Sequence, residues 1–146
     1  MRLLTVALIA AVLAACSAPA APEPPSRSES EFDICEAAFR HQFANNASAV
    51  QQKAAAYFLE IRGKDPTPEF LARFADHTPP VKAGSAFETG KGLKFHVESI
   101  EWLGDDRVKV SGGYYEASLS ASGNEYVVER KGDGWKVTND TMLRIS

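Results

Sequence analysis

From Val81 onward, apolar and polar residues alternate in short runs, as in Leu93, Phe95 and Val97. Alternation at every second position is the spacing of a half-buried β-strand. The breaks between runs contain glycine and stand at residues 90–92, 104–106, 122–124 and 132–134. Because such breaks favour hairpin turns, an antiparallel meander is expected for this half of the chain. The alternation changes phase near Ser99, which predicts a β-bulge there.

Helical signals precede this alternation. Asp33 with Glu36 three residues later is typical of a capped helix start. Cys35, Phe39 and Phe43 then fall on one face, which predicts a helix packed by an aromatic stripe. The helix is expected to end at Asn45-Asn46.

The segment from Ala47 to Ile61 fits both a helical and a strand spacing, and we expect helix to about Gln52 followed by a strand. Farther on, Thr67 followed by Pro68 combines a cap with a proline at the first helical position. A short helix is therefore expected from Pro68, ending before the prolines at 79 and 80.

Together these segments predict an α+β domain in which N-terminal helices pack on a curved antiparallel β-meander. The order of elements, ending in the strand Gly134-Trp135-Lys136-Val137, resembles the NTF2-like superfamily over Asp33 to Ser146. A cystatin-like arrangement, with a helix cradled by an antiparallel sheet, fits the same order. The NTF2-like resemblance implies functional groups on the concave face of the sheet. On this chain the strand-borne polar residues His96, Glu98 and Tyr115 are the candidates for such a pocket.

The N-terminus is typical of a targeting signal. Arg2 is followed by an apolar run from Leu3 to Ala15, too short to span a bilayer but typical of a signal peptide. The run ends in Leu13-Ala14-Ala15-Cys16, which resembles the lipobox of bacterial lipoproteins. The resemblance implies cleavage before Cys16 and attachment of acyl chains, palmitate among them, to that cysteine, and several chains anchor a protein stably.

The chain is therefore expected to divide into a signal peptide (1–15), a lipidated cysteine with a Pro-, Ala- and Ser-rich tether (16–31) and one α+β domain (32–146). Ser17, rather than Asp, follows the lipidated cysteine, and in Gram-negative lipoproteins that favours the outer membrane, with the domain facing the periplasm. Cys35 then has no disulfide partner and is interpreted as a small buried apolar residue.

Several function classes are disfavoured by composition and spacing. The net charge of −3 disfavours nucleic-acid binding. The three histidines, His41, His77 and His96, are too far apart in sequence for a zinc motif. No nucleophile elbow, Ser-x-x-Lys motif or phosphate-binding loop occurs. We therefore expect no metal, no cofactor and no assigned catalytic residue.

Two functional hypotheses remain. The first is a non-catalytic, lipid-anchored binding or accessory module of the cell envelope, held to the membrane through Cys16 and acting on an envelope protein partner. The second is a small enzyme or ligand carrier that uses acid/base groups such as His96 and Glu98 without a metal.

Overall fold

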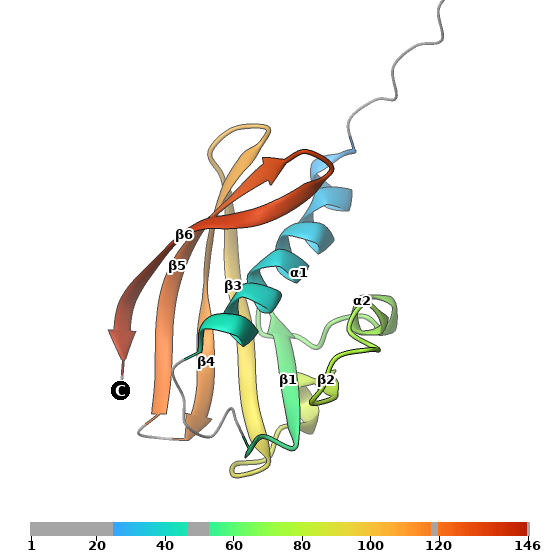
Figure 1. Ribbon diagram of the computed structural model, residues 1–146, viewed down its shortest axis with the longest axis vertical. Coiled ribbons are helices and arrows are strands. Elements are labelled where there is room, and N and C mark those ends of the chain that lie inside the picture. Colours follow the sequence, from blue (N-terminus) through green and yellow to red (C-terminus); the bar gives the residue numbers. More distant parts are fainter. Residues whose placement is uncertain (1–24, 47–52, 118–119, 146) are drawn as a thin grey trace, which may run out of the picture.

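The computed structural model describes residues 25–46, 53–117 and 120–145, and Figure 1 shows how their elements are arranged. The elements in chain order are helix α1 (Arg27–Asn45), strand β1 (Ala56–Ile61), helix α2 (Pro68–Ala72), strand β2 (Val81–Ala83), 3-10 helix η2 (Gly84–Ala86), and strands β3 (Gly92–Trp102), β4 (Arg107–Ala117), β5 (Ser120–Lys131) and β6 (Gly134–Ile145). The strands form one layer, and α1 lies obliquely across one face of it (Figure 1).

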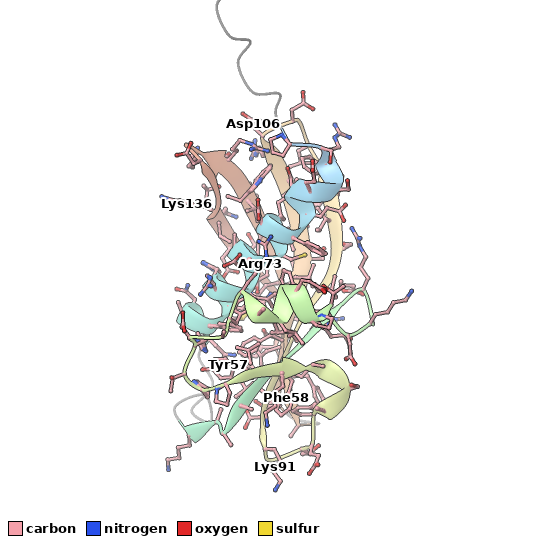
Figure 2. All side chains as sticks on the ribbon, turned by 90° about the vertical axis from the view of Figure 1, so that its right-hand side faces the viewer. Tyr57, Phe58, Arg73, Lys91, Asp106 and Lys136 are labelled. Carbon is pink, nitrogen blue, oxygen red and sulfur yellow. The ribbon has the colours of Figure 1, made fainter. Side chains whose placement is uncertain are left out.

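The sheet has six strands in the order β2-β1-β3-β4-β5-β6. Strands β3 to β6 pair antiparallel with their neighbours, whereas β1 is parallel to both β2 and β3. Lys91, just before β3, and Asp106, just before β4, lie at opposite ends of the molecule (Figure 2). The long meander strands therefore run the length of the fold.

The predicted fold class is wrong. The described residues form mainly β-structure, with one long helix on a mixed sheet, rather than an α+β domain of N-terminal helices on a purely antiparallel meander. The meander itself is present as β3 to β6, but two further strands extend it. With the fold class, the NTF2-like and cystatin-like interpretations are withdrawn.

The error arises at β1 and β2. The first four residues of β1, Ala56 to Leu59, are buried on both faces and show no alternation, as is common for strands in parallel pairing. Val81–Ala83 was expected to open the meander, yet it pairs parallel with β1 at the edge of the sheet. Such pairing depends on a crossover that no local pattern announces.

Helix α1 begins earlier than predicted. Its N-cap is Ser26, whose side chain accepts a hydrogen bond from the backbone N–H of Glu29, while the Glu29 carboxylate accepts one from the N–H of Ser26. This reciprocal capping box stabilises the helix start, so Asp33 lies inside the helix rather than at its cap. The predicted end is confirmed, since Asn46 is the C-cap. The predicted continuation to Gln52 falls outside the described residues.

The core lies between α1, α2 and the sheet face that α1 covers, which we call the inner face. Phe39 is completely buried, and the rings of Phe43, Phe70 and Phe74 lie 6.1–6.5 Å from its own, measured between ring centroids. The inner face contributes the residues Tyr57, Leu59, Leu93, Phe95, Val97, Val108, Val110, Tyr114, Tyr126, Val128 and Trp135. Aromatic pairs of this geometry add to the apolar burial that stabilises the fold.

Helix α2 starts as predicted, with Thr67 as N-cap and Pro68 at the first helical position. Phe70 of this helix enters the core. Arg73, at its C-terminal end, donates hydrogen bonds to Asp33 (2.7 Å) and Glu36 (2.9 Å) of α1. The ion pairs join α2 to α1 at a partly exposed site, where Arg73 is visible between the two helices in Figure 2.

Of three other local predictions, two are confirmed and one is wrong. The bulge near Ser99 is confirmed by a register shift between Val97 and Ser99. Cys35 is 2% exposed, and burial raises the pKa of its thiol to about 12, as expected of an inert apolar residue. The turn predicted at 122–124 is wrong, because these residues lie within β5 and pair with both neighbouring strands.

Candidate functional site

The three predicted pocket residues, His96, Glu98 and Tyr115, line one open cleft of about 650 Å³. The cleft lies on the sheet face opposite α1, the outer face, because His96 alternates with the core residues Phe95 and Val97 along β3. The structure therefore brings these side chains together, on the face of the sheet that α1 does not cover.

Two glycines lie between His96 and Arg144 across the strands of the sheet. His96 is opposite Gly113 in β4, Gly113 is opposite Gly123 in β5, and Gly123 is opposite Arg144 in β6. A Cβ atom at Gly123 would lie 2.7 Å from Nε of Arg144, so the arginine side chain lies across the glycine. Because neither glycine has a side chain, His96 of β3 and Arg144 of β6 both line the outer cleft.

Arg144 is a lining residue that the sequence analysis missed. Its position relative to His96 is set by the register of four strands, and no short-range spacing signals it. Two ion pairs stand at the rim, Lys94 with Glu60 (3.1 Å) and Arg62 with Glu31 (3.0 Å).

The three predicted side chains of the outer cleft, all within the described residues, do not form a hydrogen-bonded network with one another. Burial lowers the pKa of His96, so its imidazole is neutral at pH 7. Glu98 and Tyr115 are exposed, and across the described residues no hydrogen bond joins His96, Glu98 and Tyr115 to one another. The groups can therefore contact a bound molecule individually, without a preassembled proton relay.

The two edges of the sheet differ. One edge strand, β2, is three residues long and follows Pro79 and Pro80, features that protect an edge from further pairing. The other, β6, is twelve residues long and pairs only with β5 among the described strands. Every residue from Thr138 to Ile145 is exposed.

Large apolar side chains accumulate at the end of this long edge. Met142 is 54% exposed, Leu143 63% and Ile145 64%, the three highest values among the large apolar residues of the described chain. Unpaired backbone groups beside exposed apolar side chains form a template for another strand. We call this feature, residues 138–145, the open edge.

Cys16 and the rest of the predicted signal peptide and tether up to residue 24 lie outside the described residues. Among those that are described, no helix is both long and apolar enough to cross a bilayer. The described part of the chain also holds no cluster of three His, Cys, Asp or Glu side chains arranged to bind a metal ion.

No protein-family model, curated protein sequence or solved structure matches this chain.

Proposed function

We propose that the protein is a lipid-anchored binding module of the cell envelope that holds a protein partner by adding a strand of that partner to β6. The observation that carries this proposal is the open edge, a strand end with three exposed large apolar side chains that pairs with no described strand other than β5. The opposite edge strand, β2, is three residues long and follows two prolines. It therefore does not offer a comparable length of exposed backbone for pairing.

Strand addition supplies affinity and specificity from different groups. The backbone N–H and C=O groups of β6 that point away from β5 would pair with an extended segment of the partner. Met142, Leu143 and Ile145 would contact apolar side chains of that segment. The expected partner segment is therefore extended and apolar at alternate positions, and free of proline.

The anchor places this edge near a membrane. Under the lipoprotein resemblance, Cys16 carries the acyl chains, and residues 17–24, rich in proline and alanine, separate the domain from the bilayer. Ser17 favours the outer membrane with the domain in the periplasm. The partner is then another protein of the envelope.

A second candidate function is a small-molecule carrier or acid/base enzyme using the outer cleft. It is favoured by one observation, the half-buried His96 that stays neutral at pH 7 and lines a cleft together with Glu98 and Tyr115. Replacement of His96 by Gln should abolish that activity and leave partner capture at β6 unchanged.

The strand-addition proposal is tested by placing a photo-crosslinking amino acid at Thr141 in the open edge, in cells that make the full chain. The matched position on the other edge is Lys82 of β2. We expect one reproducible adduct from Thr141 and none from Lys82. Equal adducts from both positions, or none from Thr141, would overturn the proposal.

A charge variant sharpens the result. Leu143→Lys puts a charge on the open edge and should remove the adduct, because natural edges use lysine to prevent pairing. Its control is Leu103→Lys, since Leu103 is 49% exposed and lies in the turn between β3 and β4, far from the open edge. The adduct should persist in this control.

The anchor has its own test. Cys16→Ser should move the chain from the membrane to the soluble fraction, and mass spectrometry of the N-terminal peptide should show acyl chains only when Cys16 is present. An unmodified peptide from the Cys16 chain would contradict the lipoprotein assignment without affecting the crosslinking result at Thr141.

A further inference from the structure

A second, smaller cleft lies on the inner face, between the C-terminal turn of α1 and the ends of β5 and β6. It encloses about 30 Å³, room for one polar group about the size of a water molecule. Its polar walls are formed by Gln42, Asn45, Asn46, Tyr114, Ser122, Asn124, Tyr126 and Asp140. We call it the inner cleft; it shares Asp140, Met142 and Ile145 with the open edge, but its binding chemistry does not require strand addition.

A hydrogen-bond network surrounds the Asp140 carboxylate. Asn45 donates from Nδ2 to Nδ1 of His41 (3.2 Å), and Nε2 of His41 lies 2.9 Å from Asp140 Oδ2. The Asn45 amide also donates to the backbone carbonyl of His41 (2.9 Å), which fixes the imidazole beside the cleft. Asn124 Nδ2 donates to the other oxygen of Asp140 at 2.7 Å. Each oxygen of the carboxylate therefore has a nitrogen within hydrogen-bond distance, and the charge of Asp140 lies at the edge of the cleft.

Two buried acceptors in this cleft have no partner. Gln42 is 5% exposed and Asn124 9% exposed, and neither Gln42 Oε1 nor Asn124 Oδ1 accepts a hydrogen bond. Neither amide can be turned around, because Gln42 Nε2 donates to the His96 carbonyl and Asn124 Nδ2 to Asp140. Buried acceptors that stay unsatisfied are destabilising, so a bound hydrogen-bond donor that reached Gln42 Oε1 and Asn124 Oδ1 would be stabilised.

The remaining walls suit a cation on an apolar stem. The rings of Phe95, Tyr114 and Tyr126 line the cleft, and aromatic faces attract cations. Burial and the neighbouring Asp140 carboxylate raise the pKa of Tyr126, so its phenol stays neutral. Met142 and Ile145 also line the cleft and are more than half exposed, so they form an apolar mouth.

We propose that the inner cleft binds a primary ammonium group carried on an unbranched alkyl stem. The ammonium has three N–H donors, which match Gln42 Oε1, Asn124 Oδ1 and the Asp140 carboxylate. The stem leaves along Met142 and Ile145. A lysine side chain and a small aliphatic amine share this chemistry, and a quaternary ammonium is too large and has no N–H to donate.

The test is an NMR titration of the ¹⁵N-labelled full chain with n-butylammonium chloride, with n-butanol and butyltrimethylammonium as comparison probes. We expect saturable shifts of the side-chain amide signals of Gln42 and Asn124 with butylammonium alone. A parallel titration with Nα-acetyl-lysine N-methylamide separates the two sources: tighter binding than butylammonium assigns the site to lysine side chains, and weaker or equal binding assigns it to small amines.

Variants locate the binding. Asp140→Asn should weaken butylammonium binding about tenfold or more, because it removes a charged acceptor. The control Asp133→Asn makes the same charge change in the exposed turn before β6 and should bind normally. Gln42→Met, which keeps the Asp140 network, provides a second variant if Asp140→Asn fails to fold, and it too should bind more weakly.

Three results would overturn the proposal. An equal response to butanol would mean that only the alkyl stem binds, at the apolar mouth of the cleft, without recognition of the ammonium group. Equal binding of butyltrimethylammonium would indicate an aromatic cation site without directed hydrogen bonds. No saturable response to butylammonium would mean that water satisfies Gln42 and Asn124.

Discussion

Gly113, at the centre of the outer face, should tolerate no side chain. A Cβ atom there would lie 2.0 Å from the backbone oxygen of Ser122 in β5 and 2.8 Å from its carbonyl carbon. An ordinary C···O contact is about 3.3 Å, so β4 and β5 would have to separate by roughly 1.3 Å at this point. Such a shift strains the core and breaks one or two backbone hydrogen bonds.

The expected effect of Gly113→Ala follows from these two terms. Overpacking destabilises by about 1–3 kcal/mol and each lost hydrogen bond by about 1 kcal/mol, so unfolding free energy should fall by about 2–4 kcal/mol. For a domain of this size the Tm should drop by roughly 10 °C. Thermal and urea unfolding, followed by circular dichroism, measure both quantities.

The control is Gly134→Ala. Nothing lies within 4 Å of a Cβ atom at Gly134, and its backbone conformation is one that alanine adopts. This variant should change stability by less than about 1 kcal/mol, in the stabilising direction if at all. If Gly113→Ala were as stable as Gly134→Ala, the close approach of β4 and β5 at Gly113 would be refuted.

Four further outcomes follow from the structure. Phe39→Ala should lower the unfolding free energy by about 3–5 kcal/mol, since the ring is fully buried among three others, and urea titration measures this. Ser26→Ala should lower it by about 1 kcal/mol in the same assay through loss of the capping box. The Cys35 thiol, whose burial raises its pKa to about 12, should react with a thiol reagent at pH 8 only at the rate of unfolding. Because burial lowers the pKa of His96 in the fold, the unfolded chain binds its proton more readily, so stability should fall as pH drops below about 6.5, and His96→Gln should lessen that fall in urea titrations.

Predictions that rest on neighbouring residues were accurate. The start of α2 at Thr67-Pro68, the end of α1 at Asn46 and the bulge before Ser99 follow from caps, proline geometry and a phase change within one strand. The hairpin between β5 and β6 contains the predicted glycine break at 132–134. These signals depend on interactions within a few residues, so distant strand pairing does not change the local structure that they predict.

Predictions that rest on distant partners failed. The break at 122–124 was interpreted as a turn, but Gly123 is in a strand because it faces Gly113 and lies under Arg144. A glycine required for close approach has the same sequence signature as a glycine required for a turn. Parallel pairing of β1 with β2 and β3 was missed for the same reason, since the partners are separated by whole elements.

The candidate functional residues show the same difference between near and distant partners in the sequence. His96 and Glu98 lie near one another on a strand, so their shared cleft was foreseeable, and Tyr115 joins them through pairing of β3 with β4. Arg144 and Asp140 acquire their neighbours only when β6 closes the meander. The open edge itself is a property of the strand order, which no segment of sequence carries alone.

The most direct test of strand addition to β6 is backbone hydrogen exchange of the peptide covering residues 134–145. It is measured by mass spectrometry on the chain in isolated envelopes and on the purified full chain. The open edge should exchange quickly when purified and several times more slowly in envelopes, while the peptide covering β2 exchanges equally in both. Equal exchange of residues 138–145 in the two samples would show that nothing pairs with this edge and would contradict the proposed function.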